Sequence, residues 1–536
     1  MQDLRSTPEV KGLKSIFSIS LRSSLIMVVS VMLLLFSCSQ RNRRDGYIYY
    51  RLNTNPTTLD PSFIVDVTGG YIAAKLFNGL VRLDENLNII PDIAEKWSIS
   101  DDNLVYTFKL RRDVKYHNKR NVKAYDFKYS FKRILDPRTN SPNTWVLEKV
   151  VGAKAFMEGK TGDLEGLKVI DDYTLQVRLE RPFAPFLYLL TTSATYVVPE
   201  EEVKKWGPDF STHPVGTGPF ILKDWRPNRE LRLERNNTYF AKEGRVSGII
   251  YRVIPEDLTA VTEFELGNLD VISIPAQEFA RYRKDPKWKN LIISVEGINT
   301  YYIGLNCSRP PFDNVRLRKA VNLAIDREKL LSTFYENRGR LAAGPVPDLL
   351  RKWDRPSLYG YDPLKARKIV EEQGMSGHAI RFYITAEQEV VDMAEFIQSY
   401  MKKAGLNVKI TQLEWSAYKE AVNKGEPDMF WLSWWADYPD PEDFLFPLFH
   451  SSNMGPAGNR TRYRNATVDR LIELGQAADK WPLRNSYYEA AENIIVEDAP
   501  WVFFWHKNDY MLRQTWIRNY RAYPVYSMDK GIDVGF

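Results

Sequence analysis

Three tryptophans precede an aspartate near the C-terminal end of the chain. Trp431, Trp434 and Trp435 lie in the stretch WLSWWADYPDPEDFLFPLF, and Asp437 follows closely behind them. An unpaired carboxylate among apolar rings is strongly disfavoured and tends to take up a proton. A cationic ligand would remove this penalty, and a primary ammonium group is suitable because it donates three hydrogen bonds. The residue types therefore predict a cation-binding pocket or, with equal weight, an aspartate that caps the turn before Pro439.

The elements that must position these residues lie between residues 378 and 437. HAIRFYIT, LNVKITQL and DMFWLSWW have the pattern of strands, and AEQEVVDMAEFIQSYMKKAG and WSAYKEAVNKG have the pattern of helices. Gly405 is suited to end the first helix. The order β-α-β-α-β predicts a parallel sheet with right-handed crossovers. Ligands of such open sheets bind beyond the carboxyl ends of the strands, which is where Asp437 lies.

Strand and helix patterns also alternate through the rest of the chain, from about residue 45. Residues 106–116 and 174–180 alternate apolar and polar side chains, as half-buried strands do. Residues 220–236 predict two strands around a Pro-Asn turn, and the apolar stripe of LRKAVNLAI (317–325) predicts an amphipathic helix. The sequence therefore predicts an α/β protein.

The length of the chain predicts its number of domains, and its charge indicates which class of partner is not expected. A chain of 536 residues exceeds what one core comfortably serves, so two or three domains are expected. The net charge is +6, and basic and acidic residues are interspersed, so no nucleic-acid partner is predicted.

The sequence contains no pattern that predicts catalysis or a cofactor. The five histidines are scattered without metal-ligand spacing, so neither a metal site nor a cofactor is expected. Nucleophile elbow, phosphate-binding loop and zinc-protease motifs are all missing from the sequence. We therefore expect a binding protein rather than an enzyme.

The N-terminal segment has the pattern of a targeting signal. Four basic residues precede the apolar run LIMVVSVMLLLF (25–36), which is too short to span a bilayer comfortably but suits a signal peptide. The run ends in Leu-Phe-Ser-Cys, which is similar to a bacterial lipobox with Cys38 as the lipidated residue. We predict a signal peptide over 1–37 and a lipid-anchor linker over 38–46. The alternative is an ordinary secretory signal with an incidental cysteine.

Six motifs occur along the chain in one characteristic order. They are TTLDP (57–61), PDIAEKWSISDDNLVYTFKLRRDVKYHN (91–118), DFKYSFKRILDP (126–137), VGTGPF (215–220), PPFDNVRLRKAVNLAIDREKL (310–330) and WWADYPDPEDFL (434–445). With these motifs the chain resembles the extracytoplasmic solute-binding lipoproteins of bacterial oligopeptide and dipeptide ABC transporters, the family 5 solute-binding proteins. The resemblance covers nearly all of the chain after the signal segment.

This resemblance implies a two-lobed periplasmic-binding-protein clamp of class II with an additional small α+β domain. Lobe I would comprise residues 45–65, 190–290 and 506–536, the small domain residues 66–189, and lobe II residues 291–505. A peptide would lie extended between the lobes, with its backbone paired to short strand edges, as in β-strand addition.

The resemblance also implies a set of ligand-binding residues. Asp437 would pair with the α-ammonium group of the peptide, and Asn55 lies in a segment, TNPT, that would offer backbone groups. The aromatic residues of the implied pocket and cleft are Trp145, Tyr301, Tyr302, Trp415, Trp431, Trp434 and Trp435. Trp145 is the loosest match, and it could equally cover the core of the small domain.

The chain departs from some of these relatives at the other end of the expected ligand. Those relatives hold the peptide carboxylate with an arginine at the position of Trp431 and a histidine at the position of Glu389. They also carry a disulfide-bonded cysteine at the position of Trp435. Neither cation is present here, which suggests the hypothesis that Glu389 and Asp437 favour cationic or amide-ended ligands.

These observations together predict a monomeric receptor outside the cytoplasm, anchored to a bacterial membrane through lipid on Cys38. It would capture peptides between its lobes and deliver them to the permease subunits of an ABC transporter in the membrane. Another cationic solute or a metal chelate, such as a nickel complex or haem, is the alternative ligand class.

Overall fold

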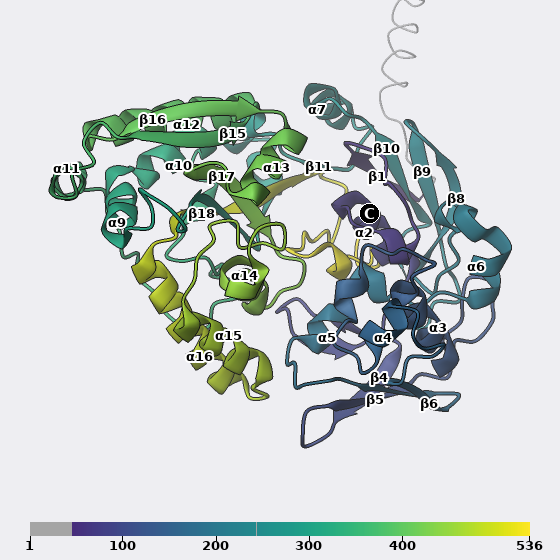
Figure 1. Ribbon diagram of the computed structural model, residues 1–536. Helices are drawn as coiled ribbons and strands as arrows, with labels where there is room; N and C mark the ends of the chain where they lie inside the picture. The colour runs from purple at the N-terminus through teal and green to yellow at the C-terminus, as the bar shows by residue number, and fades with distance from the viewer. Residues whose placement is uncertain (1–45, 243) are drawn as a thin grey trace, which may run out of the picture. The chain divides into compact units, whose positions relative to one another are not determined.

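The computed structural model describes residues 46–242 and 244–536 of the chain (Figure 1). The predicted signal peptide and the lipidation site Cys38 lie outside the described residues. Residues Ile48–Phe536 form one compact unit. Within the described ranges, no helix is both long enough and apolar enough to cross a membrane.

A twelve-stranded sheet runs through this unit. Its main path is β16 (Asn407–Leu413), β15 (Ala379–Thr385), β17 (Met429–Trp435), β13 (Asn299–Leu305), β18 (Trp501–Arg513), β11 (Val271–Ser273), β1 (Tyr47–Leu52), β10 (Gly248–Val253), β9 (Glu230–Arg235) and β8 (Phe220–Arg226). Two further strands, β12 (Ile292–Glu296) and β14 (Gly339–Leu341), pair with β18 beside this path. The long strand β18 pairs with β13 and β14 through its first half and with β11 and β12 through its second half. A single strand therefore joins the two halves of the sheet.

The parallel part of the sheet confirms the predicted β-α-β-α-β order. Strand β15 pairs in parallel with both β16 and β17. The connecting helices are α12 (Gln388–Lys403) and α13 (Trp415–Lys424), which lie close to these strands in Figure 1. Gly405 follows α12 with a φ of +86°, a left-handed conformation that glycine adopts without steric cost. The carboxyl ends of β15, β16 and β17 consequently meet at one edge of the sheet.

A second, antiparallel sheet has the order β4 (Ala94–Ile99), β5 (Val105–Leu110), β7 (Thr174–Arg178) and β6 (Leu167–Asp171). The short hairpin β2 (Val81–Leu83) and β3 (Ile89–Pro91) is separate from it. The expected strand over 106–116 is wrong at its C-terminal end, because the backbone N–H of Arg111 bonds to Ile93 and Lys115 makes only an isolated bridge. The antiparallel sheet falls inside the range predicted for the small domain, while the domain boundaries themselves stay a prediction.

The predicted hairpin and amphipathic helix are both confirmed. Strands β8 and β9 pair in antiparallel fashion around a turn in which Asn228 has a φ of +61°. Helix α9 spans Val315–Ala324 and buries its apolar stripe. The remaining helices are α2 (Val67–Leu76), α3 (Ala124–Leu135), α4 (Ala153–Met157), α5 (Phe186–Leu189), α6 (Glu200–Trp206), α7 (Asp257–Glu265), α8 (Phe279–Lys284), α10 (Arg327–Tyr335), α11 (Pro363–Glu372), α14 (Glu442–Phe449), α15 (Ala466–Ala477) and α16 (Trp481–Asp498).

Apolar cores pack against both faces of the sheet around β13. Tyr301 and Ile303 belong with the core that covers α9, α10 and α12, whereas Tyr302 lies in the core beneath α14, α15 and α16. Alternate residues of a strand point to opposite faces, so neighbouring positions of β13 enter different cores. The core of the small sheet includes Tyr438, which lies just beyond β17. The segment that carries Asp437 is therefore built into the packing of two regions of the chain.

Candidate functional site

Asp437 lies two residues past the end of β17, at the carboxyl edge of the parallel strands. Its side chain is open to solvent, yet the surrounding protein desolvates it and raises its pKa to about 6. The protein atoms around this exposed carboxyl group therefore make its ionisation less favourable than in water. No cation pairs with this carboxylate within the described part of the chain. Asp437 can therefore accept a cation from outside the protein.

The other acids of DYPDPED support the loop rather than face a ligand. Asp443 is buried in the first turn of α14, where it accepts the Asp437 N–H at 2.9 Å and the Trp434 indole N–H at 3.4 Å. Asp440 is buried in an ion pair with Arg484 at 2.7 Å. The carboxylate of Glu442 accepts the Gln476 amide at 2.6 Å and the Tyr438 hydroxyl.

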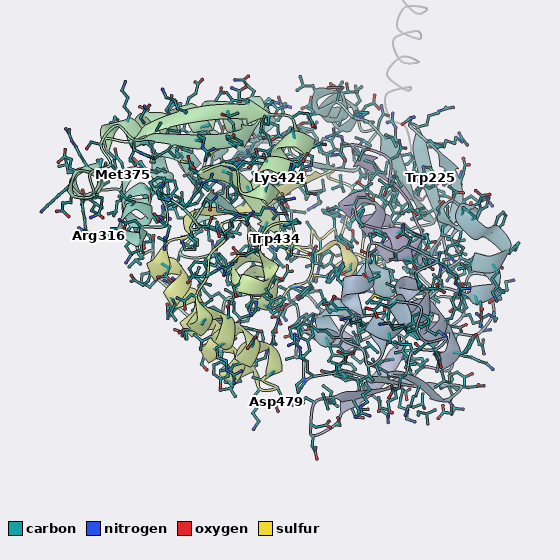
Figure 2. All side chains as sticks on the ribbon, in the orientation of Figure 1. Trp225, Arg316, Met375, Lys424, Trp434 and Asp479 are labelled. Atoms are coloured by element: carbon teal, nitrogen blue, oxygen red, sulfur yellow. The ribbon has the colours of Figure 1, made fainter. Side chains whose placement is uncertain are left out.

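Three of the predicted tryptophans lie at the same edge as Asp437. Trp435 ends β17 and is 47% exposed, and Trp434, labelled in Figure 2, is half-buried beside Asp443. Trp415 begins α13, directly after β16, and is 52% exposed while its ring stacks on Tyr418 with centroids 6.0 Å apart. Large exposed indole surfaces are typical of binding sites. The structure thus brings these side chains to the edge where ligands of open sheets bind.

Trp431 and Tyr302 have a different environment from the exposed tryptophans. Trp431 is only 8% exposed and packs on Phe504, with ring centroids 5.1 Å apart. Tyr302 is buried and stacks on Trp501 at a centroid distance of 3.4 Å. Both residues therefore have structural roles in the two cores, and ligand contacts of either residue stay a prediction.

Tyr301 and Glu389 meet on one side of the sheet. Tyr301 is half-buried on β13, and its pKa is raised by burial and further by the charges of Asp509 and Glu389. Glu389 is exposed in the first turn of α12, directly after β15, and hydrogen-bonds to the Tyr335 hydroxyl. Burial is the main cause that raises the pKa of Tyr335, and the Glu389 charge adds to it.

Trp145 and Asn55 come from distant parts of the chain. The Trp145 ring stacks on Tyr438, the residue after Asp437, with centroids 6.2 Å apart and planes inclined by 26°. The Asn55 side chain exchanges two hydrogen bonds with Asn228 in the β8–β9 turn, at 2.6 and 2.8 Å. Its side chain is therefore committed to the fold, which leaves backbone groups of the segment for a ligand.

Sequence reasoning missed two residues that surround this site. The charge of Asp437 contributes to raising the pKa of Tyr526, although burial is the main cause, so the two side chains are electrostatic neighbours. The Tyr526 ring also fills the space where a Cβ on Gly70 of α2 would lie, 2.4 Å from the nearest ring atom. The second missed residue is Lys507 on β18, whose Nζ lies 5.1 Å from the centroid of the Tyr335 ring and whose pKa is raised by the charge of Glu389 against the larger lowering effect of burial. A signal for Lys507 was visible, because charged residues interrupt the otherwise apolar strand WVFFWHKNDYMLR.

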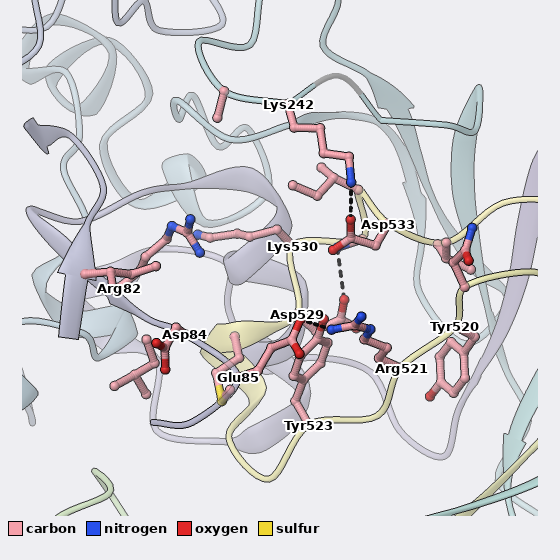
Figure 3. Close-up of a pocket in the computed structure, with 18 of the residues that line it drawn as sticks. Arg82, Asp84, Glu85, Lys242, Tyr520, Arg521, Tyr523, Asp529, Lys530 and Asp533 are labelled. Atoms are coloured by element: carbon pink, nitrogen blue, oxygen red, sulfur yellow. Dashed lines mark hydrogen bonds and ion pairs between the residues drawn. The ribbon is translucent and has the colours of Figure 1, made fainter. Parts of the chain in front are cut away.

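A cavity of about 380 Å³ lies elsewhere, where the C-terminal segment crosses the β2–β3 hairpin (Figure 3). Lys242 pairs with Asp533 at 2.6 Å across it, and Arg521 pairs with Glu85 of the hairpin. None of the ten predicted ligand-binding residues lines this cavity. The charged side chains that line the cavity thus pair with one another. The Arg521–Glu85 pair connects the C-terminal segment to the hairpin.

The parallel strands, the strand that joins two halves of the sheet and the residues at the carboxyl edge define a two-lobed α/β solute-binding protein. The chain belongs to the bacterial extracellular solute-binding proteins of family 5, whose family model, described as the middle region, matches residues 88–456. The predicted resemblance and the predicted two-lobed fold are thereby confirmed. The family is one of extracytoplasmic binding proteins.

Individual relatives match along most of their length. The periplasmic oligopeptide-binding protein OppA of Escherichia coli is 30% identical over 483 residues, which covers 86% of this chain and 87% of that protein. Heme-binding protein A of Haemophilus influenzae is 29% identical over 474 residues, which covers 83% of this chain and 84% of that protein. The structure of HbpA2 from Haemophilus parasuis superposes with a TM-score of 0.81 at 25% sequence identity, and the match covers 91% of this chain and 99% of that chain.

Proposed function

We propose that this protein is the substrate-binding receptor of a peptide ABC transporter. It captures peptides between its lobes and delivers them to the permease subunits in the membrane. The observation that carries the proposal is Asp437, a solvent-accessible carboxylate with a raised pKa and without a cation partner in the described residues. The α-ammonium group of a peptide supplies the missing positive charge and three hydrogen-bond donors.

The surroundings of Asp437 suit an extended peptide. Trp434 and Trp435 precede the carboxylate on β17, so indole surface lies beside the place that the first peptide residue would occupy. Tyr526 approaches Asp437 from the C-terminal segment, and β18 joins that segment to the half of the sheet that carries Asp437. A ligand that binds groups from both halves favours the closed arrangement, by no more than its difference in affinity for the two arrangements.

The location of the receptor follows from its N-terminal sequence. The proposed protein acts as a monomer outside the cytoplasm, held at the membrane by lipid on Cys38. Several acyl chains would anchor it stably, since one chain alone gives only marginal binding. Incorporation of labelled palmitate into the wild-type protein, and its loss in Cys38→Ala, would support this anchor, whereas equal labelling of the two would contradict it.

Calorimetric titration with short peptides tests the proposed function directly. Asp437→Ala should weaken binding by about 100-fold, because a charge-assisted hydrogen-bond partner of the ammonium group is lost. Asp479→Ala is the matched control, because Asp479 is exposed in the connection between α15 and α16, away from β17 (Figure 2). Native mass spectrometry should also detect peptide that co-purifies with the wild type. Equal affinity of the wild type and Asp437→Ala would overturn the ammonium site.

A metal chelate or another cationic solute is the second candidate, because one relative is Heme-binding protein A. Within the described ranges, no group of three or more His, Cys, Asp or Glu residues could hold a metal ion. This finding concerns a bare metal ion, whereas the metal of a chelate such as haem already has ligands and takes only one or two from a protein. Titration with haem, followed by its absorbance band, distinguishes the candidates: saturable haem binding that peptides do not displace would favour this second function.

A further inference from the structure

Two cations lie without ion pairs beside the strand that joins the halves of the sheet. Lys507 is half-buried on β18, and Arg338, just before β14, is only 6% exposed. The Lys507 Nζ lies 5.1 Å from the centroid of the Tyr335 ring, and the Arg338 guanidinium lies 5.5 Å from that of Phe279. Neither cation forms an ion pair with any residue that the structure describes. The Arg338 Nε–H donates a hydrogen bond to the Tyr335 carbonyl at 3.1 Å, which satisfies one donor but does not neutralise the charge. Partly buried cations without a counter-ion are costly, so both are candidates to bind an anion.

The nearby carboxylates act on these cations only from beyond ion-pair distance. Burial is the main effect on Lys507 and lowers its pKa, Arg338 lowers it further, and Glu389 and Asp509 oppose the shift. Glu389 is already engaged by the Tyr335 hydroxyl. Tyr335 thus holds the glutamate in place while its ring lies beneath the lysine.

Lys507 lies close to the predicted peptide site. Trp435 of β17 is paired with Asn299 of β13, and the Asn299 side chain bonds to the Lys507 backbone at 2.8 and 2.9 Å. Trp435 and Lys507 are therefore two strands apart, and the distance between their backbones is on the order of 10 Å.

The sheet also presents Lys507 to the same side as Tyr301. Tyr301 is paired with Trp505, and residues paired across antiparallel strands point to one face. Lys507 is two residues beyond Trp505, so it shares that face as well. An extended peptide of about three residues spans roughly 10 Å, which is comparable with the separation of Lys507 from Trp435, the residue that ends β17 two positions before Asp437.

We propose that Lys507, with Arg338 behind it, binds the C-terminal carboxylate of a peptide whose ammonium group binds Asp437. The preferred ligand is then a short peptide with both termini free. Its length should be about two to four residues, because an extended chain of that length spans roughly 10 Å. This inference rests on the proposed peptide-binding function and replaces the hypothesis that Glu389 selects amide-ended ligands. Lys507 supplies the positive charge that the positions of Trp431 and Glu389 lack.

Calorimetry with trialanine and its C-terminal amide tests this subsite. The wild type should bind the free acid about 10- to 100-fold more tightly than the amide, as expected for a hydrogen bond between charged groups. Lys507→Met should lose this preference while its affinity for the amide stays unchanged. Lys507→Arg should keep the preference, and Lys365→Met on α11, an exposed lysine, is the matched control.

The outcomes separate this subsite from the proposed function. Equal wild-type affinity for acid and amide, or an equal loss for both in Lys507→Met, would overturn the subsite and leave peptide binding intact. Binding of neither form by the wild type would overturn the proposed function and the subsite with it. Near-ultraviolet circular dichroism checks the fold, and if Lys507→Met is unfolded, retention of the free-acid preference in Lys507→Arg but not in Lys507→Gln supports the subsite.

Discussion

The backbone N–H of Asp437 donates a hydrogen bond to the buried carboxyl group of Asp443 at 2.9 Å. Burial raises the pKa of Asp443 well above its ordinary value, and the charge of Asp437 raises it further. The pKa of Asp437 itself is about 6. Asp437 is open to solvent whereas Asp443 is buried, so a negative charge is accommodated more easily on Asp437. The pair offers one negative charge to a ligand and holds its position with the other carboxyl group.

Peptide affinity should decrease at acidic pH. The ammonium group requires an ionised Asp437, whose pKa in the free protein is raised to about 6. Affinity should be full above about pH 7 and fall by up to tenfold per unit below pH 6. Titrations between pH 4.5 and 8 would measure this, with Asp437→Asn as a variant that binds weakly at every pH. A wild-type affinity that stays constant between pH 7 and about pH 5 would exclude Asp437 as the titrating anchor.

Ionisation of Asp437, which favours peptide binding, should lower the stability of the ligand-free protein. The pKa of Asp437 in the folded protein is above the ordinary value of 3.8, so ionisation of Asp437 disfavours the folded state above about pH 6. The ligand-free Asp437→Asn variant should therefore melt at a higher temperature than the wild type at pH 7. This difference should shrink as the pH falls through the range between the two pKa values.

Asp443 should matter as a hydrogen-bond acceptor rather than as a charge. Asp443→Asn keeps an oxygen that can accept the N–H groups of Asp437 and Trp434, so peptide affinity should stay within about threefold of the wild type. Asp443→Ala removes the acceptor and releases the loop, and affinity should fall by about tenfold. A calorimetric titration of both variants measures this. Equal losses in the two variants would show that the charge of Asp443 is what matters.

Replacement of Glu389 should strengthen the binding of free-acid peptides. Glu389 lies near Lys507 and would repel a carboxylate bound there. Glu389→Gln keeps a partner for the Tyr335 hydroxyl but removes this charge, so affinity for trialanine should rise by about two- to tenfold. Affinity for trialanine amide should not change, which serves as the internal control. Weaker binding of the free acid by this variant would show that Glu389 contributes favourably to the ligand.

The buried ion pair between Arg484 and Asp440 should stabilise the loop that follows Asp437. Both side chains are almost fully buried and their charged atoms lie 2.7 Å apart. Arg484→Met leaves Asp440 without a partner and should lower the free energy of unfolding by about 3–5 kcal/mol, measured by urea denaturation. The control is Arg470→Met, which breaks an exposed pair with Glu473 and should cost less than about 1 kcal/mol. Similar losses in the two variants would contradict this role.

Much of the fold around the site could be predicted from local sequence patterns. The periods of apolar residues identified β15, α12, β16, α13 and β17 and their order, since these periods repeat within each segment. The parallel arrangement then followed from general rules of handedness, and it located Asp437 at a carboxyl edge. The end of the strand after Leu110 could not be predicted, because a long-range hydrogen bond to Ile93 decides where the chain turns.

The sequence by itself determined the family, the parallel strands and the aspartate at their edge, because each of these depends on residues close together in the chain. Only the tertiary structure decided which aromatic residues are exposed. Trp431 and Trp435 both occupy β17, yet the first is covered by Phe504 from β18 and the second is open to solvent. The tertiary structure also decided that Lys507 lies close to Tyr335 and that Tyr526 lies close to Asp437. These partners lie far apart in the chain, and only strand pairing and packing bring them together.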